Sequence, residues 1–106
     1  MVGWMARERA SLERIKEEVP LPPGWKWVMV VDEPAVEGPG RQYGDGHSWL
    51  TWHKDTSEWT VRIVPVGYKN TPHPYAEMLG INTGSTDIVD AAKLLANYVY
   101  LGMVSP

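Results

Sequence analysis

Hydrophobic and polar residues alternate along positions 46–64, which is the pattern of a β-hairpin with one buried face. A turn at 54–57 makes Trp52 face Trp59 and Leu50 face Val61 across the two strands. Because strand side chains alternate between the two faces of a sheet, this register predicts one apolar face, formed by Leu50, Trp52, Trp59, Val61 and Ile63. The other face is predicted to carry Trp49, Thr51, His53, Glu58, Thr60 and Arg62. We therefore expect Trp52 and Trp59 in the core and Trp49 on the solvent side.

Two further segments have the spacing of amphipathic helices. The apolar face of the C-terminal segment is broad; Ser85 or Thr86 is its expected cap, and the helix ends near Leu101, before Gly102. This broad face is the cover that the apolar side of the hairpin requires. The N-terminal helix is predicted over 5–19, and its apolar stripe is narrow: Met5, Leu12, Ile15 and Val19. That stripe could dock on the sheet or form the seam of a homodimer, and we favour docking.

The pattern also predicts one more strand and two long connections. Residues 25–32 alternate as a strand, with Trp25, Trp27, Met29 and Val31 on one face. Gly and Pro punctuate residues 33–46, which predicts a loop. A second connection covers 65–85, and the pattern there defines neither a strand nor a helix. Whether the loops 33–46 and 67–84 are ordered does not follow from the sequence.

These elements predict an α+β fold in a single domain that spans residues 1–106. An N-terminal helical arm would occupy 1–19. Residues 20–106 would form an antiparallel sheet of three or four strands, with the C-terminal helix packed on one sheet face.

Composition narrows the chemistry and the compartment. The chain has 106 residues, 43% of them hydrophobic, which suits one globular core. It has no cysteine, which excludes disulfides, thiolate metal sites and thiol nucleophiles and favours a reducing compartment. Charges alternate over residues 1–18, and the longest apolar run, 27–31, is far too short to span a bilayer. We therefore expect a cytoplasmic protein with no membrane partner.

The distribution of charge disfavours nucleic acid as a partner. The formal net charge is -3, and residues 1–19 carry four basic and four acidic side chains, so the excess of acid resides in 20–106. No cluster of Lys and Arg follows Lys16, whereas binding to a phosphate backbone normally needs a basic surface.

No combination of residues in the sequence is specific enough to assign catalysis, a metal or a cofactor. His47 and His53 share one strand face with Asp45 and Asp55 nearby, but an extended strand separates the two histidines by roughly 20 Å, too far for one metal ion. His53 faces Glu58, which suits either acid–base catalysis or a surface ion pair. Ser48 lacks the glycine pattern of a nucleophile elbow. His73, between two prolines, suits a stiff loop or a recognition tip.

The leading functional hypothesis is therefore a small non-catalytic protein-interaction module, such as an accessory or inhibitor protein of a phage or other mobile element. Its predicted partner-binding residues are the polar hairpin set: Trp49, Thr51, His53, Glu58, Thr60 and Arg62. Trp49 and Arg62 could anchor a protein partner, as these residue types dominate interface hot spots, or form a cation–π pair with each other. A third alternative is that the N-terminal helix buries Trp49.

Two alternatives remain open. One is a sheet-based nucleic-acid-binding domain that uses Arg62, Lys54, Trp49 and His53, and the other is a small enzyme that uses His53 and Glu58. The identity of the partner is not encoded in any recognisable motif.

Overall fold

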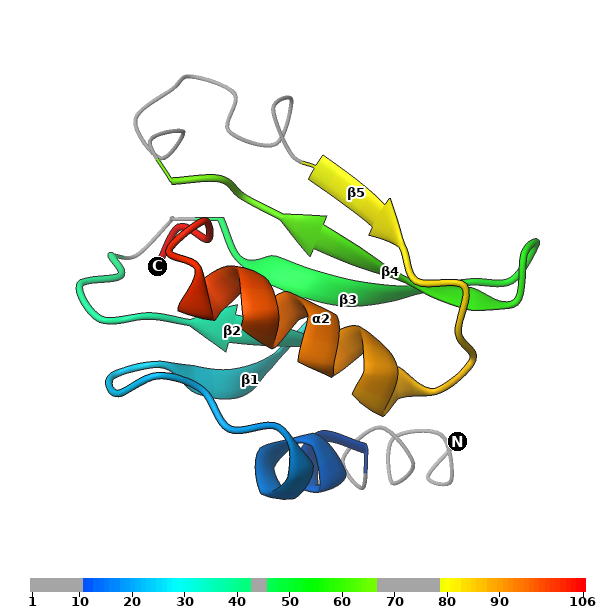
Figure 1. The fold of residues 1–106 in the computed structure, drawn as a ribbon, viewed down its shortest axis with the longest axis horizontal. Helices are drawn as coiled ribbons and strands as arrows, with labels where there is room; N and C mark the ends of the chain where they lie inside the picture. The colour runs from blue at the N-terminus through cyan, green and yellow to red at the C-terminus, as the bar shows by residue number, and fades with distance from the viewer. Residues whose placement is uncertain (1–10, 43–45, 67–78) are drawn as a thin grey trace.

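The fold is α+β, with one antiparallel sheet and two helical segments (Figure 1). A computed structural model describes residues 11–42, 46–66 and 79–106. Residues 11–18 are helical, and the elements that follow are β1 (Lys26–Val30), β2 (Glu33–Glu37), β3 (Ser48–His53), β4 (Glu58–Ile63), β5 (Leu79–Asn82) and α2 (Ile88–Tyr100). No helix among these residues is both long and apolar enough to cross a membrane.

The sheet is a meander in which each strand pairs with the next one along the chain, in the order β1-β2-β3-β4-β5. The helix α2 lies across one face of it (Figure 1). The helical residues 11–18 pack on the same face, because their apolar side chains share one core cluster with α2 and with residues of the sheet. Both described helical segments therefore cover one face of the sheet, and neither covers the other face.

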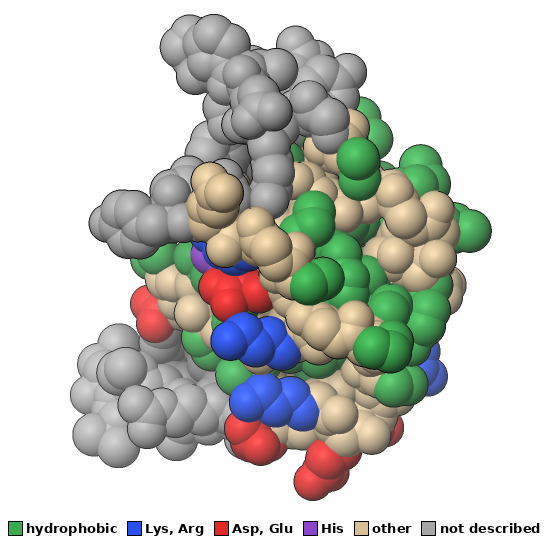
Figure 2. Space-filling model, turned by 90° about the vertical axis from the view of Figure 1, so that its left-hand side faces the viewer, with side chains coloured by type: hydrophobic (Ala, Val, Ile, Leu, Met, Phe, Trp, Pro, Cys, Tyr) green, Lys and Arg blue, Asp and Glu red, His purple; other side chains and the backbone are tan. Residues whose placement is uncertain are grey.

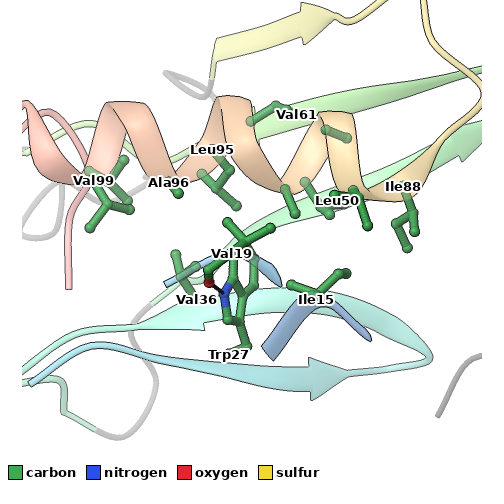
Figure 3. Close-up of a cluster of buried hydrophobic side chains, with 14 of the residues drawn as sticks. Ile15, Val19, Trp27, Val36, Leu50, Val61, Ile88, Leu95, Ala96 and Val99 are labelled. Carbon is green, nitrogen blue, oxygen red and sulfur yellow. Dashed lines mark hydrogen bonds between the residues drawn. The ribbon is translucent and has the colours of Figure 1, made fainter. Parts of the chain in front are cut away.

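The core lies between the sheet and these two helical segments (Figure 3). The helix α2 contributes Ile88, Val89, Ala91, Ala92, Leu95, Ala96 and Val99 to it. Three of these are alanines, and their small side chains let the helix backbone approach the sheet closely, as dense interior packing requires. The N-cap of α2 is Asp87, whose carboxylate accepts a hydrogen bond from the amide of Val89, rather than Ser85 or Thr86 as the sequence predicts.

The N-terminal stripe docks on its own domain. Leu12, Ile15 and Val19 are buried, and the indole Nε1 of Trp27 donates a hydrogen bond to the carbonyl of Val19 at 2.9 Å (Figure 3). These three side chains are thus packed in the protein's own core and are not exposed to a second copy of the chain. Met5, the fourth residue of the stripe, lies outside the described residues.

The prediction of three or four strands was too low, because residues 33–46 do not form a continuous loop. The chain reverses in two residues at Val31 and Asp32, both with positive φ (46° and 66°), so that Glu33 already pairs with Val30 in β2. Two-residue hairpin turns of this kind normally contain Asn or Gly, and neither is present here. Val31 is consequently an exposed turn residue, not an inward-facing strand residue.

The fifth strand, β5, lies in the connection predicted over 65–85. It pairs with β4 as the edge strand of the sheet, with Ile81 opposite Val61. The signal for this strand is weak because it has only four residues, one of which is Gly80.

The register of the β3–β4 hairpin is confirmed in full, from Trp49 opposite Arg62 to His53 opposite Glu58. Leu50, Val61 and Ile63 are buried as expected. The prediction that Trp52 is in the core was wrong: its side chain is 40% exposed, although it lies on the same face as Leu50. The tip of this hairpin extends past the first turn of α2, so the helix does not cover it (Figure 1).

Trp59, the partner of Trp52, is only half-buried. The two indoles contact each other with ring centroids 5.4 Å apart, and the Trp59 Nε1 donates to the carbonyl of Thr86 at 3.2 Å. The two rings thus close one end of the core as a partly exposed pair.

Candidate binding face of the sheet

We call the face of the sheet that points away from α2 the open face. The strand register assigns to it Lys26, Val28 and Val30 of β1, Glu33, Ala35 and Glu37 of β2, Trp49, Thr51 and His53 of β3, Glu58, Thr60 and Arg62 of β4, and Gly80 and Asn82 of β5. All six residues predicted to bind a partner are on this face. Strand side chains alternate between the two faces of the hairpin, and this alternation puts the six residues on one face, as the sequence predicts.

The six side chains are less accessible than an uncovered face suggests. Thr60 is 1% exposed, and its hydroxyl donates to the Oδ1 of Asn82 at 2.9 Å, so it joins β4 to β5 and offers little to a partner. The other five, Trp49, Thr51, His53, Glu58 and Arg62, are half-buried. The accessible part of the open face is thus formed by these five and their neighbours on β1 and β2.

Arg62 does not stack on Trp49 as a cross-hairpin pair would. A Cβ atom built on Gly80 would lie 2.8 Å from a guanidinium nitrogen of Arg62, so the guanidinium lies over β5. Trp49 is on β3, on the opposite side of β4. The absence of a side chain at Gly80 gives the arginine this position, and the two expected anchors therefore occupy separate parts of the open face.

A group of charged side chains surrounds Glu37 at one end of β2. The His47 Nε2 lies 2.8 Å from Oε1 of Glu37, the Arg41 Nε lies 3.5 Å from the same oxygen, and the Lys26 Nζ lies 3.6 Å from Oε2. The hydrogen bond with His47 lowers the pKa of Glu37 below its usual value; burial opposes this effect, and the charges of His47, Lys26 and Arg41 add to it.

The sequence did not reveal this group, because Glu37 falls in the segment that was predicted to be a loop. The sequence signal that was available is the short apolar run Pro34–Val36 between two glutamates. Figure 2 shows a histidine, basic side chains and acidic side chains close together on this side of the molecule, without a large area of one charge sign.

A hollow of about 200 Å³ opens on the same face, between the β1–β2 turn and β3. Its described lining consists of Val30, Val31, Glu33, His47 and Trp49. It combines an indole ring, two valines, a carboxylate and an imidazole. Of these five, only Trp49 was predicted to bind a partner, and His47 was considered as a metal ligand. Val31 and Glu33 were missed because the turn that brings them beside Trp49 was not predicted.

His53 and Glu58 face each other across the hairpin, but within the described structure no hydrogen bond or ion pair joins their side chains. The register brings His53 and Glu58 close together, but their side chains do not make the contact that acid–base chemistry between them requires. Ser48 is fully buried, and its hydroxyl accepts a hydrogen bond from the amide of Val64 at 2.8 Å. This serine has a structural partner in the sheet.

In residues 11–42, 46–66 and 79–106, no three His, Asp or Glu side chains are placed to hold a metal ion together. His47 is instead hydrogen-bonded to Glu37. Asp45 and His73, which the sequence analysis also considered, lie outside the described residues.

Comparison of the chain with protein-family models, with curated proteins and with solved structures found no significant match.

Proposed function

We propose that this protein is a small non-catalytic interaction module that binds another protein through the open face of its sheet. The observation that carries the proposal is the position of Trp49: it is half-buried in the central strand of a face that neither described helical segment covers. A partly buried tryptophan on such a face can bury more apolar area when a partner docks, and tryptophan is enriched among the residues that dominate binding energy.

The charges of the open face favour a protein over a nucleic acid. Lys26 and Arg62 are accompanied there by Glu33, Glu37 and Glu58, so both signs are interspersed. Nucleic-acid binding relies on phosphate neutralisation by a basic surface, whereas a protein interface usually combines an apolar centre with a polar rim of both signs. The sheet-based nucleic-acid reader is therefore the second candidate.

A small accessory or inhibitor protein acting in the cytoplasm, of the kind that phages and other mobile elements encode, accords with the size of the chain and with the absence of cysteine. Binding would be the whole activity of such a protein. The proposal therefore assigns no catalytic residue to His53 or Glu58.

The test is affinity capture with the immobilised chain and two variants. Thr51→Lys places a long charged side chain in the middle of the open face. Thr51 is the neighbour of Trp49 on this face of β3. The matched control, Lys93→Glu, changes a charge on the exposed side of α2. We expect one protein species to be captured by the wild type and by Lys93→Glu, and to be lost from Thr51→Lys.

Circular dichroism melts first establish that both variants are folded. Capture that persists in folded Thr51→Lys would contradict binding through the open face. Recovery of nucleic acid, with loss of binding after nuclease treatment, would replace the proposal with the second candidate.

A further inference from the structure

We propose that the hollow between the β1–β2 turn and β3 receives a lysine or arginine side chain of the partner protein. This inference rests on the proposed function, since it specifies the chemistry of the partner that docks on the open face.

The volume suits a single side chain. Pockets for drug-sized ligands and cofactors usually enclose about 300–1,000 Å³, and this hollow has about 200 Å³.

The charge of the hollow favours a cation. Glu33 is half-buried in the lining, and no side-chain hydrogen bond or ion pair connects its carboxylate to any other residue that the structure describes. Lys26 and Arg41 do not neutralise it, because both are paired with Glu37 at the other end of β2, as is His47. A half-buried carboxylate without a counterion gains a charge-assisted contact when an ammonium or guanidinium group enters.

The remaining walls match the rest of a basic side chain. Lysine and arginine carry a long aliphatic stem that packs on apolar surface while the charged end stays polar. Val30 and Val31 supply apolar surface, and the indole of Trp49 is the aromatic ring that attracts cations most strongly. A neutral apolar side chain would leave Glu33 desolvated without compensation.

The position of Val31 is consistent with a contact surface. This β-branched residue is 87% exposed and has a φ of 46°, a conformation that is unfavourable for its side chain. Strained backbone of this kind is found preferentially at ligand-binding elements. The turn holds the valine at the rim of the hollow, where a partner would cover it.

The experiment uses amide NMR titration of the full chain with three small probes: N-acetyl-lysine methylamide, N-acetyl-arginine methylamide and N-acetyl-norleucine methylamide. The norleucine probe has the lysine stem without the ammonium group. We expect saturable shifts at Val30, Val31, Glu33 and the Trp49 indole with a basic probe, and none with norleucine.

The variant Glu33→Gln keeps the shape of the side chain and removes its charge. It should weaken binding of the basic probe roughly threefold to tenfold, which is the range expected for a half-exposed charge pair. The matched control Glu17→Gln removes an exposed carboxylate from the helical residues 11–18, which pack on the other face of the sheet, and should change binding less than about twofold. Trp49→Phe provides a second test, because a phenyl ring attracts cations less than an indole does.

Three results would overturn the inference: no saturable shift with either basic probe, equal binding of norleucine, or unchanged affinity in both Glu33→Gln and Trp49→Phe. These failures are separate from failure of the proposed function. If the probes fail while a captured protein is still lost from Thr51→Lys, the open face binds a partner without a basic anchor. If the probes bind as expected and no protein is captured, the hollow is a site for basic groups and the interaction function is wrong.

Discussion

The imidazole Nε2 of His47 lies 2.8 Å from the carboxylate of Glu37, and this contact joins the residue before β3 to the last residue of β2. Arg41, from the segment between the two strands, contacts the same carboxylate and also donates to the carbonyl of Gly46 at 3.2 Å. Glu37 thus fastens the start of β3 beside the end of β2, where these strands share only two paired positions.

This arrangement predicts how stability depends on pH. The pKa of Glu37 is lowered in the folded protein, so the carboxylate contributes stability above the usual value of 4.5 and loses that contribution as the pH falls through the lowered value. We expect Glu37→Gln to lower the free energy of unfolding by about 1 kcal/mol near neutral pH. The difference from the wild type should shrink below the usual pKa of the group.

Urea denaturation at a series of pH values measures this difference directly. Glu58→Gln is the control, since no ion pair holds that side chain in the described part of the protein, and its effect should be small at every pH. A gap between Glu37→Gln and the wild type that grows as the pH falls would contradict the assigned pKa direction.

The hairpin gives a second prediction, about which side chains support the core. Leu50→Ala removes a side chain with 0% exposure beneath α2 and should cost about 2–5 kcal/mol. Trp52→Ala should cost less, roughly 1–2 kcal/mol, because 40% of that side chain is already in solvent and the ring that it contacts, Trp59, is itself only half-buried. Denaturant melts of the two variants provide the comparison, and equal losses would mean that Trp52 is held more tightly than its exposure indicates.

The register of β3 and β4 was predictable because it depends on local information only. Alternation fixes the face of each residue, and a polar turn fixes the reversal. The exposure of Trp52 was not predictable in this way, since it depends on where α2 begins relative to the hairpin tip. That position is set by the cap at Asp87 and by packing between elements far apart in the sequence.

The residues of the candidate site divide in the same way, into those that the local pattern predicts and those that depend on tertiary structure. Trp49 and its neighbours on β3 and β4 follow from parity, whereas the hollow and the contacts of Glu37 require β2. That strand was missed because its turn, Val31–Asp32, contains neither glycine nor asparagine and yet adopts the positive φ angles of a tight hairpin. Tertiary pairing of β2 on both sides overrides the unfavourable turn residues.

The same turn yields a third prediction. Val31→Asn should stabilise the protein by about 1 kcal/mol, because asparagine tolerates positive φ and the exposed valine loses little burial. The matched control is Val66→Asn, since Val66 is also exposed but has no positive φ, and it should give no gain. Thermal melts of both variants distinguish relief of backbone strain from a general benefit of polar surface, which would raise the stability of both.

The buried hydroxyl of Ser48 gives the last prediction. Its Oγ accepts a hydrogen bond from the amide of Val64, and both residues are almost completely inaccessible to solvent. Ser48→Ala removes the acceptor and leaves a buried N–H group without a partner, which should lower the free energy of unfolding by about 1–3 kcal/mol. Thr56→Ala, in the exposed turn of the same hairpin, should change the free energy of unfolding by less than about 0.5 kcal/mol.

Urea melts should be paired with amide hydrogen exchange at Val64. This exchange is expected to accelerate in Ser48→Ala and to stay unchanged in Thr56→Ala. Unaltered exchange at Val64 in the serine variant would show that this amide is protected by something other than the Ser48 hydroxyl.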